Sequence, residues 1–106
     1  MSAPHLSVTE LKEALARGEQ PLLLDVREEW EHELARLPGS TLIPLGVLHE
    51  RADELDKDSP LVVLCHHGVR SQHAIGLLRS LGFTRLQNLT GGIDAYSAID
   101  PSIPRY

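Results

Sequence analysis

The only cysteine in this sequence of 106 residues, Cys65, has neighbours that could make it a nucleophile. Cys65 directly follows the apolar run 61–64. The residues after it are His66, His67, Gly68, Val69, Arg70 and Ser71. A loop that leaves a buried strand and turns into a helix presents several backbone N–H groups toward one point, and the helix dipole adds partial positive charge there. Such a cradle favours a thiolate over a thiol at its centre, which supplies a nucleophile at neutral pH.

Two further residues of this segment fit an anion-binding loop. Gly68 lets the backbone curl without a side-chain clash, and Arg70 adds a permanent positive charge with several donors. An arginine at the start of a helix is unfavourable beside the positive end of the dipole unless an anion is present. We therefore expect Arg70 to face a bound anionic ligand.

The competing interpretation is that Cys65 is a buried structural residue. Free cysteine is among the residue types most often buried, and it usually behaves as a small hydrophobic side chain. The polar residues after Cys65 favour the reactive interpretation, because Leu61 and Leu64 already fill the strand. His66 and His67 are expected at a polar rim, since adjacent side chains diverge and a zinc site would need further ligands. A single cysteine also excludes a disulfide scaffold.

The elements that must position this loop are predicted to be short strands alternating with helices. Strands are expected at 22–26, 41–43, 61–64 and 86–89. Helices are expected at 7–18, in the first half of 27–37, and at 45–55, 71–81 and 93–99. This alternation implies an α/β fold with a mainly parallel sheet covered on both faces. Ligands of such sheets bind outside the carboxyl ends of the strands, where Cys65 lies.

The composition limits the classes of protein to which the chain can belong. We expect one domain over residues 1–106, because a domain usually takes ~100 to 200 residues. The net charge of -5 argues against general nucleic-acid binding. No apolar run approaches the roughly 18 residues of a membrane span. The start lacks the basic and apolar segments of a secretory signal, so a cytoplasmic location is expected.

Four segments resemble single-domain rhodaneses, a sulfurtransferase family, and the similarity covers nearly the whole chain. Residues 65–71 look like the active-site loop of that family, and residues 24–28 resemble its Asp-x-Arg segment. Residues 38–44 are similar to its Pro-Gly-Ala-x-x-Ile-Pro stretch, and residues 88–93 to its Leu-x-Gly-Gly-Ile turn. The resemblance implies a rhodanese-like α/β fold with a small, mainly parallel five-stranded sheet and helices on both faces.

The resemblance has departures and one addition. Ala35-Arg36-Leu37 stands where many members carry Gly-His, so any role of that histidine is absent. Trp30 and Tyr96 lie near positions where the family often has aromatic residues, and we interpret them as core or rim packing. The segment 100–106 is similar to the tail of rhodanese domains fused to adenylating enzymes that feed sulfur-carrier proteins.

The activity that the resemblance implies is a two-step sulfur transfer without a cofactor or a metal. The Cys65 thiolate attacks the outer sulfur of a small anionic donor such as thiosulfate, and a thiophilic acceptor then removes that sulfur from the Cys65 persulfide. The acceptor would be cyanide, a thiol or a sulfur-carrier protein. The substrate-binding residues would be His66, His67, Gly68, Val69, Arg70 and Ser71. Arg70 would help sulfite leave, and Asp25 and Arg27 would brace the loop from the neighbouring strand end.

Two other functions stay open. In a related fold, cysteine phosphatases separate Cys and Arg by five residues, whereas four residues separate Cys65 from Arg70. The shorter loop makes a narrower cradle, which suits a single sulfur better than a phosphate. A non-catalytic rhodanese-like module that binds partners or senses redox state is the other alternative. Such modules commonly lose the cysteine, but Cys65 could still form mixed disulfides.

Overall fold

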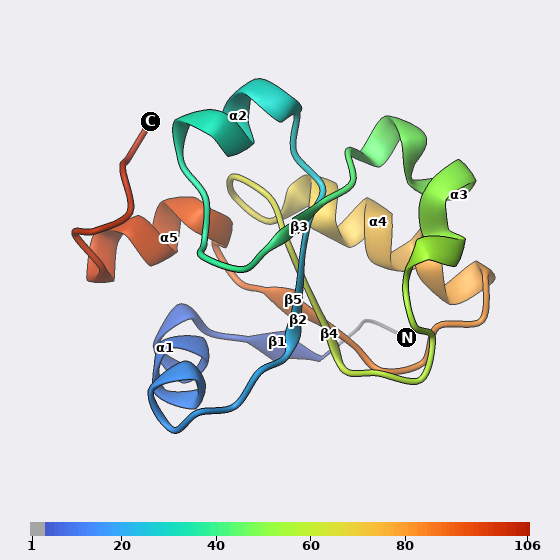
Figure 1. Cartoon of the computed structure of the whole chain (residues 1–106), viewed down its shortest axis with the longest axis horizontal. Helices are drawn as coiled ribbons and strands as arrows, with labels where there is room; N and C mark the ends of the chain where they lie inside the picture. The colour runs from blue at the N-terminus through green and yellow to red at the C-terminus, as the bar shows by residue number, and fades with distance from the viewer. Residues whose placement is uncertain (1–3) are drawn as a thin grey trace.

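A parallel five-stranded sheet forms the centre of the computed structural model, which describes residues 4–106 (Figure 1). The strand order is β1-β5-β4-β2-β3, and each neighbouring pair is parallel. The strands are β1 (His5–Leu6), β2 (Leu22–Asp25), β3 (Thr41–Leu42), β4 (Leu61–Leu64) and β5 (Leu86–Leu89). The central strand β4 is apolar at every position because helices cover both of its faces.

Helices cover both faces of the sheet. They are α1 (Val8–Ala16), α2 (Glu29–Leu34), α3 (Leu48–Arg51), α4 (Val69–Ser80) and α5 (Gly92–Ile99), with two 3₁₀ turns at Leu45–Val47 and Ala52–Glu54. On one face, Val63 of β4 packs with side chains of α3 and α4. On the other face, Val62 and Leu64 pack with side chains of α1 and α5. Cys65 continues the alternation of β4 and belongs to the α3 and α4 side.

The fold class predicted from the sequence and from the resemblance is confirmed, and the differences concern one strand that was not predicted, one divided helix and one helix start. The pattern did not identify β1, a two-residue edge strand that pairs with β5 through His5 and Leu6. The helix predicted at 45–55 is divided into two 3₁₀ turns with the short α3 between them. The helix predicted to begin at Ser71 begins at Val69, after Gly68.

The capping box predicted for the first helix is present. The Ser7 hydroxyl accepts a hydrogen bond from the Glu10 N–H, and the Glu10 carboxylate accepts one from the Ser7 N–H, both at 3.0 Å. Within residues 4–106 no helix is long and apolar enough to cross a membrane. The expectation that the chain lacks a secretory signal concerns its first residues, of which 1–3 lie outside the described range.

Candidate active site

Cys65 follows β4 directly, and its side chain is buried at the carboxyl end of the sheet with 1% of the residue exposed. The Gly68 N–H donates a hydrogen bond to Cys65 Sγ at 3.0 Å. Gly68 has a φ of +113°, which residues with a side chain rarely adopt. This backbone conformation turns the Gly68 amide toward the sulfur. The helix α4 begins at the next residue, Val69. The loop therefore wraps around the sulfur, as an anion cradle requires, while the thiol is also a buried core residue.

The start of α5 fixes the orientation of the loop. The N–H of Ile93 donates to the Cys65 carbonyl at 2.9 Å, and the N–H of Asp94 donates to the His66 carbonyl at 3.0 Å. A trans peptide points its N–H opposite to its C=O, so the next two amides of the loop are turned away from α5. Gly92 permits this contact because a Cβ there would collide with both carbonyls.

Ser71 connects the sulfur to β5. Its hydroxyl lies 3.5 Å from Cys65 Sγ and makes hydrogen bonds with the Gly68 carbonyl at 3.0 Å and with Asn88 Oδ1. Ser71 and Asn88 are both buried, so these partners satisfy polar groups that water does not reach. Ser71 was expected as a loop residue, whereas the role of Asn88 was not predicted, because Asn88 follows the polar Gln87 in β5 and the sequence does not show that it is buried.

The anion that faces Arg70 is a carboxylate of the chain itself. Glu31 of α2 accepts two hydrogen bonds from the Arg70 guanidinium, at 2.6 and 2.8 Å. These bonds lower the pKa of Glu31 to about 2 and raise the pKa of Arg70. Because Glu31 supplies a negative charge beside this helix start, the position of Arg70 does not by itself require a bound ligand, and its role in binding substrate stays a prediction.

Asp25 and Arg27 support α2 and the C-terminal segment. The buried Arg27 guanidinium binds Asp25 at 2.7 Å and donates to the backbone carbonyls of Glu31 and Ala35. It also donates to the Tyr106 hydroxyl at 2.7 Å, and that hydroxyl donates to Glu31 at 2.8 Å. Through these bonds the two residues hold α2, whose Glu31 binds Arg70, and their role in bracing the loop stays a prediction.

Tyr106, which the sequence analysis mentioned only as part of a tail, lies at the centre of this network. Burial raises the pKa of its hydroxyl to about 12, and the hydrogen bond to Glu31 adds to this shift while Arg27 opposes it. Figure 1 shows the C-terminal segment returning from α5 toward α2. Its partners lie 75 and 79 positions away in the chain, so no local pattern could have identified them.

The two histidines lie at the rim of the site. His66 is half-buried and stacks on Tyr106 with ring centroids 4.1 Å apart, whereas His67 is exposed and lies 3.8 Å from Asp94. Trp30 packs edge-on against Tyr106 and stays 61% exposed. The Val69 side chain is exposed, and its contact with a substrate stays a prediction. Among residues 4–106, no three side chains of the metal-ligating types cluster closely enough to hold an ion.

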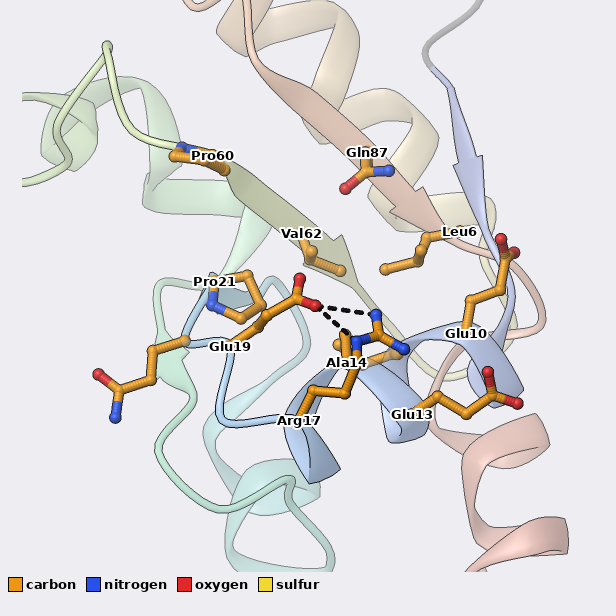
Figure 2. A pocket seen from close by; sticks show the side chains of 12 residues that line it. Leu6, Glu10, Glu13, Ala14, Arg17, Glu19, Pro21, Pro60, Val62 and Gln87 are labelled. Carbon is orange, nitrogen blue, oxygen red and sulfur yellow. Dashed lines mark hydrogen bonds and ion pairs between the residues drawn. The ribbon is translucent and has the colours of Figure 1, made fainter.

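A separate hollow of about 660 Å³ lies at the opposite end of the sheet (Figure 2). Pro21 and Pro60, which precede β2 and β4, line it together with residues of α1. The Arg17–Glu19 ion pair spans its opening at 2.8 Å. Because Cys65 follows the carboxyl end of β4, this hollow does not belong to the thiol site.

The fold and the site together define a class: a parallel α/β protein whose one buried thiol is held by a loop and the helix that follows. The rhodanese-like domain model matches residues 7–99. The chain therefore belongs to the rhodanese-like sulfurtransferase family.

Individual relatives agree with this assignment. The chain is 36% identical over 92 residues to the putative sulfur carrier protein YrkF of Bacillus subtilis, covering 87% of this chain and 50% of that protein. It is 34% identical over 87 residues to a sulfurtransferase of Allochromatium vinosum, covering 82% of this chain and 81% of the relative. The structure of the human single-domain sulfurtransferase TSTD1 matches with a TM-score of 0.79 at 30% identity, over 91% of this chain and 96% of that one. The chain thus spans only half of its Bacillus relative.

Proposed function

We propose that this chain, as one rhodanese domain over residues 1–106, moves a sulfane sulfur through a persulfide on Cys65. The observation that carries the proposal is the hydrogen bond from the Gly68 N–H to Cys65 Sγ at 3.0 Å. It lies in a loop whose carbonyls are bound to α5, which leaves the amide side of the loop for the sulfur. The membership of the family and the name of the Allochromatium relative support the same chemistry.

In the first step, the Cys65 thiolate attacks the outer sulfur of the donor. A bond forms between Sγ and that sulfur, the donor S–S bond breaks, and the leaving group takes its electron pair; from thiosulfate the leaving group is sulfite. Amides of residues 66–71 stabilise the negative charge on the transferred sulfur. The Ser71 hydroxyl lies 3.5 Å from Sγ, where it accepts a hydrogen bond from the thiol, and it holds the loop by donating to the Gly68 carbonyl.

In the second step, a thiophilic acceptor attacks the outer sulfur of the persulfide, and the electron pair of the broken bond returns to Sγ. We propose cyanide or a thiol as acceptors in solution, and a sulfur-carrier protein as the partner in the cell. The name of the Bacillus relative supports the last of these. A cytoplasmic location belongs to the same proposal, because thiols stay reduced there.

The test is sulfur transfer to cyanide by the wild-type chain and by Cys65→Ser, with both thiosulfate and an organic persulfide as donors. We expect the serine variant to fold, as judged by circular dichroism, and to show only background transfer, because a hydroxyl cannot form the intermediate. Transfer by a folded Cys65→Ser protein at the wild-type rate would refute the proposal. Turnover of an aryl phosphate at a rate comparable to sulfur transfer would favour the cysteine phosphatase, and a folded wild-type chain without transfer would favour a binding or redox-sensing module.

A further inference from the structure

The charges around the thiol are arranged in pairs that cancel. Arg70 binds Glu31 with distances of 2.6 and 2.8 Å, and Arg27 binds Asp25 at 2.7 Å. Each arginine therefore has its charge neutralised by a carboxylate of the chain. The thiolate of Cys65 then adds one negative charge that these pairs do not balance.

Glu31 is fixed beside Arg70 by several hydrogen bonds, so separating the two residues would cost free energy. Its side chain is 5% exposed. Besides the two bonds from Arg70, it accepts hydrogen bonds from the Tyr106 hydroxyl at 2.8 Å and from the Glu28 N–H at 3.0 Å. Because its pKa lies near 2, it is ionised throughout the physiological range. An anionic donor that binds Arg70 would have to share the guanidinium with this carboxylate.

The charge of the sulfur donor determines how strongly this site repels it. Thiosulfate brings two negative charges toward a thiolate, and like charges repel each other strongly at the short distance that the reaction requires. An organic persulfide carries at most one negative charge on its sulfur, and none in the R–S–SH form that reacts. Its organic group can also contact the aromatic rim of Trp30, His66 and Tyr106, which thiosulfate cannot use.

We propose that Glu31 is a specificity-determining residue, which holds Arg70 and so selects an organic persulfide over thiosulfate as the sulfur donor. This inference rests on the proposed function. The Cys65 thiolate attacks the outer sulfur of R–S–SH, the S–S bond breaks, and RS⁻ leaves with the electron pair. The proton stays on the transferred sulfur, so the products are Cys65–S–SH and a thiolate.

The first test compares kcat/KM for thiosulfate and for a persulfide whose alkyl group is uncharged, with cyanide as the acceptor. The wild-type chain should prefer the persulfide. Glu31→Gln keeps acceptor and donor atoms in place but frees the Arg70 charge, so it should raise the thiosulfate-to-persulfide ratio of kcat/KM about tenfold. The control Glu33→Gln removes an equal charge from an exposed position on the same helix and should leave the ratio unchanged. In the double variant Glu31→Gln/Arg70→Ala, the increase in the thiosulfate-to-persulfide ratio should disappear.

The second test uses the wild-type chain alone, so it does not depend on the folding of a variant. If the site repels thiosulfate, added salt should raise kcat/KM for thiosulfate and change the persulfide value much less. A decrease with salt would show that Arg70 attracts the anion, and it would overturn the inference. The inference would also be overturned by an unchanged thiosulfate-to-persulfide ratio in a folded Glu31→Gln variant, or by a wild-type preference for thiosulfate. If neither donor leaves a sulfur on Cys65, the proposed function itself fails.

Discussion

Ser71 is the residue that joins the thiol to the sheet. One hydroxyl lies near Cys65 Sγ, the Gly68 carbonyl and Asn88 Oδ1, so its removal affects the sulfur, the loop and β5 together. Because Ser71 and Asn88 are buried, water cannot replace the lost partner.

Ser71→Ala should therefore lower the free energy of unfolding by about 1 to 3 kcal/mol, the cost of a buried polar group without a partner. It should also lower kcat/KM for sulfur transfer, because the loop around the sulfur loses the hydrogen bond from Ser71 to the Gly68 carbonyl. Ser80→Ala is the matched control, since the Ser80 hydroxyl also binds a helix carbonyl but is exposed. Urea unfolding followed by fluorescence measures both variants. Equal losses in the two would contradict the account of Ser71.

The residues that sequence analysis missed are those with distant partners. Cys65 and its loop were predictable because strand, cysteine, glycine and arginine are adjacent in the chain. Glu31 was not, because it lies among Glu28, Glu29 and Glu33, and its partner Arg70 is 39 positions away. Only the folded chain shows which of these carboxylates is buried.

At the scale of elements, α5 positions the loop by binding its carbonyls. The contact needs a backbone without a side chain at Gly92, which has a φ of +62° and faces the carbonyls of Cys65 and His66. Gly39 has a similar φ of +78° but open space around its Cα. Alanine substitutions at the two glycines therefore distinguish the effect of backbone strain, which both would have, from that of a steric collision, which only Gly92→Ala would have.

Gly92→Ala should reduce sulfur transfer by at least tenfold, because the loop must shift to accept the methyl group. It should also lower the free energy of unfolding by more than Gly39→Ala, for which we expect about 1 to 2 kcal/mol of backbone strain alone. Transfer rates and urea unfolding measure these effects. If the alanine at position 92 cost no more activity than the one at 39, α5 would not hold the loop.

The elements that were predictable are those with a strong local signal. The buried strands at 22–25 and 61–64 are apolar runs, and the first helix has its capping box. β1 has two residues and depends on its pairing with β5, so a pattern of burial cannot identify it. The early start of α4 follows from the left-handed Gly68, whose conformation depends on the contacts of the loop.

At the scale of the whole molecule, one apolar core lies on each face of the sheet, and an ionic network lies at the carboxyl end. This network links β2, α2, α4 and the C-terminal residue through Asp25, Arg27, Tyr106, Glu31 and Arg70. Its charges make stability depend on pH.

Acid should weaken this network through Glu31. Its pKa is lowered from 4.5 to about 2, so its contribution is complete above about pH 4.5 and is lost as the pH falls toward 2. Arg70 is 35% exposed, so solvent screening limits the contribution to about 1 to 2 kcal/mol. Between pH 5 and 2, the free energy of unfolding should fall less steeply in Glu31→Gln than in the wild type, and Glu33→Gln should follow the wild type. Parallel curves for all three would contradict this prediction.

The central claim is that Cys65 carries the transferred sulfur, and intact-mass spectrometry tests it most directly. The chain is treated with a sulfane donor and separated from the excess donor. Its intact mass is then measured before and after the addition of cyanide. We predict a gain of one sulfur atom that cyanide removes, and the single cysteine of the sequence makes its location unambiguous. Cys65→Ser should gain nothing under the same conditions. An unchanged mass of the wild-type chain with both thiosulfate and an organic persulfide, or an equal gain in the serine variant, would contradict the account.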